Sequence, residues 1–201
     1  MLENKLKITN LVELSKEEER ITKLKALELF DSKKIDEFAI GTFKGLKSIH
    51  EFLFSDIYYF AGQIRTENIS KGNFRFASCL YLKDILNKID KMPQNNFDEI
   101  IKKYVEMNIA HPFREGNGRS TRIWLDMILK KELNKVIDWS KIEKEDYLLA
   151  MERSPVKDTE IKTLIANALT DKIDDRQVFM KGIDASYQYE GYSTYKIAEL
   201  N

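Results

Sequence analysis

The chain has 201 residues, of which 43% are apolar and 33% charged, and its 33 basic residues equal its 33 acidic residues. This length is typical of one domain with its own core, so we expect a single domain over residues 1–201. The charge balance argues against a nucleic-acid partner, and the apolar stretches are too short for a membrane span. A lone cysteine and an N-terminus without an apolar signal segment favour the cytoplasm.

The first half of the chain carries helical periodicity interrupted by few prolines. Ser15 followed by Glu18 has the pattern of a capping box and predicts a helix start there. The charged run 16–20 is expected to be a solvated helix face. A second helix is expected from about 42 to 60, with His50 packed in the core rather than acting as a ligand.

A β-hairpin is predicted between residues 64 and 77, where the helical pattern stops. Gly72 and Asn73 stand at its centre between β-compatible residues, as expected for a hairpin turn. Cys79, just after it, is expected to be a small buried apolar residue.

Helical spacing returns at Phe97, after the cap residue Asn96 and with Glu99 in the capping-box position. This helix should end near Ala110, because Pro112 disfavours helical geometry in the residue before it. Further helices are expected over residues 118–131, 143–152, 158–170 and 184–190. The fold class is therefore all-α, with one small hairpin.

The segment with the clearest chemistry reads HPFREGNGRSTR and spans residues 111–122, between two predicted helices. Gly116 and Gly118 allow tight turns and close approach of a ligand. The free N–H groups at the start of the following helix form an anion site. Arg119 and Arg122 oppose the helix dipole there unless an anion is bound. A phosphate chain would satisfy all these groups.

Two residues of the segment supply reactive groups beside that anion site. Glu115 offers a carboxylate, and Mg²⁺ typically takes one or two carboxylates together with phosphate oxygens. His111 is the candidate general base, because its ordinary pKa lies near neutrality. Phe113 is expected to anchor the loop in the core. The pattern indicates phosphoryl or nucleotidyl transfer to a hydroxyl.

The segment resembles the Fic signature HPFx[D/E]GNGRxxR at every position. The stretch 56–65 also resembles the family's segment before the flap, although Phe60 stands where Trp is common. The resemblance implies a mainly helical Fic fold with the hairpin as a flap beside the active-site loop. It also implies transfer of AMP from Mg-ATP to a protein hydroxyl. The related death-on-curing branch, which transfers phosphate, has Lys in place of Gly118.

The resemblance assigns roles residue by residue. His111 would deprotonate the target hydroxyl, and Glu115 would hold Mg²⁺ against the α- and β-phosphates. The flap would dock the target protein as an added strand. The residues implied at the nucleotide are Lys71, Asn108, Gly116, Asn117, Gly118, Arg119, Arg122 and Leu148, with Asn117 at the α-phosphate and Arg122 at the γ-phosphate.

The C-terminal segment 184–191 resembles the Fic inhibitory motif [S/T]xxxE[G/N]. Ser186 and Glu190 are four residues apart and share one helix face. A negative charge in the last helical turn opposes the dipole, which a nearby cation would explain. The resemblance is to the class III arrangement, in which Glu190 would pair bidentately with Arg122 and restrain the enzyme.

Several alternatives stay open at this stage. Glu190 could assist the reverse step, the removal of AMP from a modified protein. The chain could be a silent nucleotide-binding module, although a pure binder has no need for His111. The donor could be UTP or another pyrophosphate-containing molecule. The resemblance also allows self-modification and a self-masking homo-oligomer, and it does not identify the target protein.

Overall fold

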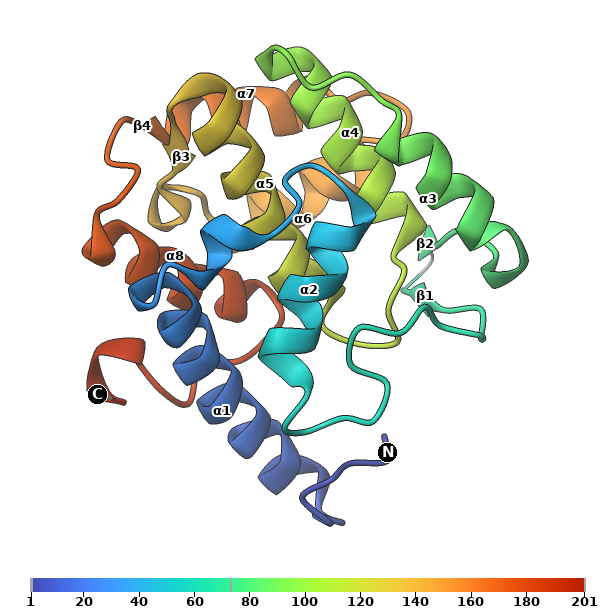
Figure 1. Cartoon of the computed structure of the whole chain (residues 1–201), viewed down its shortest axis with the longest axis vertical. Helices are drawn as coiled ribbons and strands as arrows, with labels where there is room; N and C mark the ends of the chain where they lie inside the picture. The colour runs from blue at the N-terminus through green and yellow to red at the C-terminus, as the bar shows by residue number, and fades with distance from the viewer. Residues whose placement is uncertain (1, 73, 201) are drawn as a thin grey trace.

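The computed structural model describes residues 2–72 and 74–200 and consists mainly of packed helices (Figure 1). Helix α1, Leu11–Asp31, begins after Asn10, whose side chain accepts hydrogen bonds from the N–H groups of Val12 and Glu13. The expected start at Ser15 is wrong, because Asn10 caps the helix one turn earlier and Ser15 lies inside it.

The expectation of a solvated face over residues 16–20 is also wrong in part. Glu18 and Glu19 are only 2% and 1% exposed. Glu19 pairs with Lys23 at 3.1 Å, and the tail covers this face by donating from Thr194 and Tyr195 to the Glu19 carboxylate. The charges are buried because each has a partner, which a single helix does not reveal.

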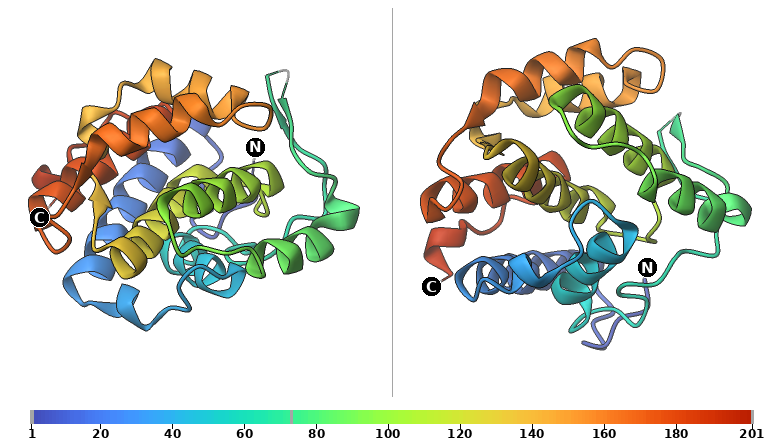
Figure 2. Two further views of the ribbon diagram at one scale, coloured as in Figure 1. Left: turned by 90° about the horizontal axis from the view of Figure 1, so that it is seen from above. Right: turned by 45° about the horizontal axis from the view of Figure 1, so that its top comes forward.

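Helix α5 lies at the centre of the molecule and contacts α2, α4 and α8 (Figure 2). Helix α2, Phe43–Phe54, is capped by Thr42 and ends six residues before the expected limit of Phe60. Helix α4, Phe97–Ala110, has the predicted cap Asn96, and α5 spans Asn117–Leu133. Both confirm the prediction to within two residues. Helix α3, Leu82–Asp90, was not predicted.

The predicted hairpin is present at one edge of the helical body (Figure 2). Its strands are β1, Ser70–Lys71, and β2, Phe74–Arg75, which pair antiparallel. Gly72 has the left-handed φ of +57° that a tight turn requires, and Asn73 lies outside the described residues. Cys79 follows in a short 3₁₀ helix and is only partly buried, contrary to expectation.

The rest of the chain closes the core around α5. Helices α6, Lys144–Arg153, and α7, Thr159–Ala168, confirm the predicted ones. A second small sheet, which was not predicted, pairs β3, Val136–Ile137, with β4, Leu169–Thr170. Short 3₁₀ helices span Lys34–Glu37, Cys79–Tyr81, Trp139–Lys141 and Ile197–Glu199.

Helix α8, Arg176–Tyr189, is longer than the expected segment because Asp175 caps it well upstream of residue 184. It packs against both α1 and α5 (Figure 1). Gly191, with φ of +91°, turns the chain just after the helix, as expected. In residues 2–72 and 74–200, no helix has both the length and the hydropathy that a bilayer crossing demands.

Candidate active site

The loop between α4 and α5 is shaped by residues in unusual backbone conformations. His111 caps α4 with a left-handed φ of +47°, and Gly116 precedes α5 with φ of +76°. A Cβ atom at Gly116 would lie 2.4 Å from the Phe54 ring, so this position requires glycine. Phe113 is fully buried, as predicted, and anchors the loop in the core.

Asn117 closes the loop on itself. Its Oδ1 accepts from the Phe113 N–H at 2.8 Å, and its Nδ2 donates to the Phe113 carbonyl at 2.7 Å. The first backbone bond of α5 runs from Ser120 to Gly116 at 3.1 Å. The N–H groups of Asn117, Gly118 and Arg119 therefore lie at a helix N-terminus without an intrahelical acceptor, the arrangement that binds phosphate.

His50 is buried, as expected, and also supports the loop. The Gly62 N–H donates to His50 Nδ1 at 2.9 Å, so the proton lies on Nε2, which donates to the Glu115 carbonyl at 2.8 Å. Burial lowers the pKa of His50 to about 3 and keeps the ring neutral. Its ring stacks on Phe113 at 3.8 Å. Nothing in the sequence pattern identified this contact.

His111 is arranged to act as a base. Its Nδ1 lies 3.2 Å from the Asn108 carbonyl, which holds the proton on Nδ1 and leaves the Nε2 lone pair free. The Phe76 ring from the hairpin stacks on the imidazole at 3.6 Å. Burial lowers the pKa of His111 to about 4, so the imidazole is neutral at neutral pH.

Glu115 presents a partly exposed carboxylate beside the start of α5. Its side chain is 43% exposed, and its Oε1 accepts from the Gly116 N–H at 2.9 Å. Among the described residues, no group of three His, Cys, Asp or Glu side chains could hold a metal ion. One carboxylate next to an anion site fits Mg²⁺ that is held jointly with nucleotide phosphates.

The two arginines of the loop have different surroundings. Arg119 is 1% exposed and pairs with Glu18 of α1 at 2.7 Å and with Glu115 at 3.2 Å. Its guanidinium also lies over the rings of Phe54 and Tyr192. The Glu18 contact was not predicted, because Glu18 lies in the run expected to be solvated.

Arg122 meets the C-terminal helix. Its Nη2 donates to Glu190 Oε1 at 2.9 Å, and its Nε donates to Ser186 Oγ at 2.7 Å. The contact to Glu190 is single rather than bidentate, because the rest of the fork bonds Ser186 and the Tyr147 hydroxyl. A Cβ atom at Gly118 would lie 2.3 Å from Glu190 Oε1, so glycine here permits the contact.

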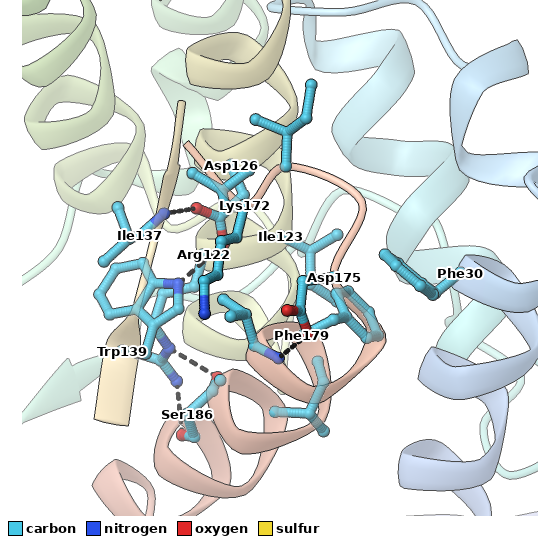
Figure 3. A pocket seen from close by; sticks show the side chains of 15 residues that line it. Phe30, Arg122, Ile123, Asp126, Ile137, Trp139, Lys172, Asp175, Phe179 and Ser186 are labelled. Carbon is cyan, nitrogen blue, oxygen red and sulfur yellow. Dashed lines mark hydrogen bonds between the residues drawn. The ribbon is translucent and has the colours of Figure 1, made fainter. Parts of the chain in front are cut away.

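Figure 3 shows the pocket behind this contact, with Arg122 and Ser186 in one wall. Asp126 lines it and accepts from the Ile137 N–H and from Trp139 Nε1, both at 2.8 Å. Burial raises the pKa of Asp126 to about 7. The cavity measures about 40 Å³, which holds only a few waters. It is too small for a nucleotide.

The remaining nucleotide candidates lie at different distances from the loop. Lys71 of the hairpin pairs with Glu190 Oε2 at 3.2 Å. Asn108 contacts the catalytic candidate His111 through its carbonyl. Leu148 is half-buried on α6, next in sequence to Tyr147, whose hydroxyl accepts from Arg122 at 3.3 Å. The roles of all three at a nucleotide stay predictions.

Comparison with known proteins places this geometry in a family. The Fic/DOC family model matches residues 42–129. Protein adenylyltransferase VbhT of Bartonella schoenbuchensis is 32% identical in an alignment of 147 residues in length that covers 66% of this chain and 30% of that protein. Probable protein adenylyltransferase y4lH of Sinorhizobium fredii is 31% identical in an alignment of 140 residues in length that covers 63% of this chain and 72% of that protein. The chain belongs to the Fic/DOC family.

A solved structure supports the fold assignment. The BepC effector of Bartonella tribocorum, with bound AMPPNP, superposes with a TM-score of 0.67 at 18% identity, covering 85% of this chain and 92% of that one. The mainly helical Fic fold is thereby confirmed. The chain spans only 30% of the length of VbhT.

Proposed function

We propose that this protein transfers AMP from Mg-ATP to a hydroxyl group of a target protein, and that Glu190 restrains the reaction. The observation that carries the proposal is the position of His111. A neutral imidazole with a free Nε2 lies in the loop that leads to the phosphate-binding start of α5. The VbhT and y4lH relatives are described as adenylyltransferases, which supports AMP as the transferred group.

In this proposal His111 Nε2 accepts the proton of the target hydroxyl while its oxygen attacks the α-phosphorus of ATP. The bond to the β-phosphate oxygen breaks, and pyrophosphate leaves. The N–H groups at the start of α5 bind the phosphates, and Arg122 binds the γ-phosphate. Glu115 would hold Mg²⁺, which would supply neutralisation of the phosphate charge. The exposed edge of the hairpin docks the target as an added strand.

The proposed restraint, of the class III kind, follows from the competition for Arg122. A guanidinium engaged by Glu190 and Ser186 lacks a free face for a γ-phosphate. The Glu190 carboxylate would also repel the phosphate charge. ATP would then bind in a non-productive pose until Glu190 leaves.

The test is protein labelling with α-labelled ATP, Mg²⁺ and lysate. We expect faint labelling by the wild type, strong labelling by Glu190→Gly and none by Glu190→Gly combined with His111→Ala. Glu199→Gly is the matched control, since Glu199 is an exposed tail glutamate and should label like the wild type. If Glu190→Gly labels no protein with ATP, UTP or other nucleotides, the transferase proposal is overturned.

A second candidate is the removal of AMP from a modified protein. It is favoured by Glu190 itself, a carboxylate that could activate water near His111 and the metal. AMP release from a pre-modified target, lost in Glu190→Ala, would support it. A silent binding module predicts neither activity.

A further inference from the structure

Arg65 lies at the start of the hairpin segment and is unusual in how its charge is held. It is 5% exposed, and its acceptors in the described part of the chain are all backbone carbonyls. Nε donates to His111 O at 2.8 Å, Nη1 to Glu67 O at 2.7 Å, and Nη2 to Ala77 O at 2.5 Å and to Ala110 O at 3.2 Å. A buried guanidinium that donates only to carbonyls, where the end of α4 meets the ends of the hairpin, indicates that Arg65 positions these segments.

Two of these carbonyls belong to the end of α4. The carbonyls of Ala110 and His111 have no intrahelical partner, so the guanidinium serves as their cap. The backbone N–H of Arg65 also donates to the Pro112 carbonyl at 2.8 Å. His111 needs this support, because a left-handed φ of +47° is strained for a residue with a Cβ atom.

The other two carbonyls belong to the ends of the hairpin. Glu67 precedes β1 and Ala77 follows β2, so one guanidinium ties both ends to the end of α4. The Ala77 N–H adds a bond to the Ile109 carbonyl at 2.9 Å. Phe76, next to Ala77, stacks on the His111 ring. The hairpin and the imidazole are therefore fixed relative to each other.

We propose that Arg65 is a positioning residue, which fixes the backbone of His111 and sets the height of the hairpin above it. The proposal rests on the proposed function, in which His111 is the base and the hairpin presents the target hydroxyl. Arg65 would set the position of His111 relative to the target hydroxyl, and it would contact neither the nucleotide nor the hydroxyl.

The charge of Arg65 has a second effect at the same place. Burial is the main cause of the low pKa of His111, and the carbonyl of Asn108 and the carboxylate of Glu190 oppose it. Arg65 and Lys71 both lower this pKa through their charges. Removal of the Arg65 charge should therefore raise the pKa of His111.

The first experiment is an NMR titration of the histidine ring protons in the full-length protein. The chain has 2 histidines, so buried His50 provides an internal control. In Arg65→Gln the pKa of His111 should rise while the His50 signal stays in place. Arg153→Gln, which removes an exposed arginine on α6, should change neither.

The second experiment measures turnover in the Glu190→Gly background. Arg65→Lys keeps the charge but cannot bridge four carbonyls, so kcat should fall by roughly 10- to 100-fold, as expected for a base displaced by about 1 Å, with KM for ATP unchanged. If Arg65→Gln fails to fold, Arg65→Lys and hydrogen exchange at the His111 amide carry the test.

The two proposals fail in different ways. A shifted His111 titration, in a chain that transfers no AMP in any variant, would support positioning and refute the transferase. If both Arg65 variants fold and transfer AMP with the parental kcat and the parental pKa of His111, the positioning proposal is refuted and the transferase proposal stands.

Discussion

Arg119 and Arg122 lie on successive turns of α5 and are 1% and 2% exposed, yet they belong to different kinds of structure. Arg119 faces α1, where its partner Glu18 is itself enclosed, with a side chain that is 3% exposed. Arg122 faces the end of α8, where the side chain of Glu190 is 22% exposed. The arginines are alike, and their partners differ in access to water.

This difference separates an enclosed ion pair, the structural pair, from an accessible one that is exchangeable in the proposed function. Glu18 also accepts from the hydroxyls of Tyr58 and Tyr192, so α1, the loop after α2 and the tail converge on it. Glu190 ends its helix, and the ion pairs of its carboxylate are with Arg122 and Lys71, two residues assigned to the nucleotide in the proposed function. In the proposed function an anion arriving at α5 replaces the accessible Glu190, whereas the enclosed Glu18 stays in place.

The largest expected effect is on stability, in Glu18→Gln. The substitution keeps the shape but removes the enclosed carboxylate of Arg119 and leaves only the partly exposed Glu115 beside this buried charge, which costs about 3–5 kcal/mol. Urea denaturation measures the free energy of unfolding. Glu17→Gln is the control, because its pair with Arg20 is partly exposed and contributes about 1 kcal/mol or less. Equal losses in both variants would mean that the buried Glu18 pair contributes no more to stability than the exposed Glu17 pair.

The pair of Glu190 with Arg122 should affect how the free energy of unfolding changes at acidic pH. Burial alone would raise the pKa of Glu190, but Arg122 and Lys71 lower it from 4.5 to about 2. A carboxyl with a lowered folded pKa contributes its stability above the unfolded pKa and loses it as pH falls through the folded one. Between pH 4.5 and about 2, the wild type should lose up to about 3 kcal/mol more than Glu190→Gln. Parallel pH curves in urea denaturation would contradict this.

The pair of Arg122 with Glu190 was predictable from sequence, and the pair of Arg119 with Glu18 was not. The loop and the inhibitory segment are contiguous motifs, so Arg122 and Glu190 could be matched by resemblance. Glu18 resembles any solvated helical glutamate until α5 and the tail cover it. Burial of a charge depends on partners distant in sequence, which periodicity along one helix does not report.

The same limit explains the errors in the fold. Asn10 and Ser15 are both good cap residues, and only the packing of α1 decides that the helix begins at Leu11. The two-residue strands β3 and β4 are too short to show an alternating pattern. By contrast, Asn96 and Pro112 bound α4 locally, and its limits followed directly from them.

Ser186→Ala should weaken the contact between Arg122 and α8, with a smaller loss of stability than the changes at Glu18 and Glu190. The buried Nε of Arg122 loses its acceptor, which costs about 1–3 kcal/mol. If part of this, about 1.4 kcal/mol, falls on the restrained state alone, labelling by the otherwise wild-type chain rises about tenfold. Ser48→Ala is the control, because its hydroxyl bonds only within α2. Unchanged labelling together with lost stability would mean that Ser186 supports the fold and not the restraint.

The smallest effect should come from Lys71, which contacts Glu190 from the solvent side. Its side chain is 60% exposed, so its ion pair at 3.2 Å should contribute less than about 1 kcal/mol and weaken with salt. A double-mutant cycle of Lys71→Gln and Glu190→Gln, followed by urea denaturation, isolates this coupling from any contact of Lys71 with a nucleotide. A coupling free energy of about 3 kcal/mol or more is typical of breaking a buried ion pair, and it would mean that the hairpin holds Glu190 as firmly as α5 does. Docking of a target on the hairpin would then have to break the restraint, and Glu190 would no longer be the freely exchangeable partner that distinguishes Arg122 from Arg119.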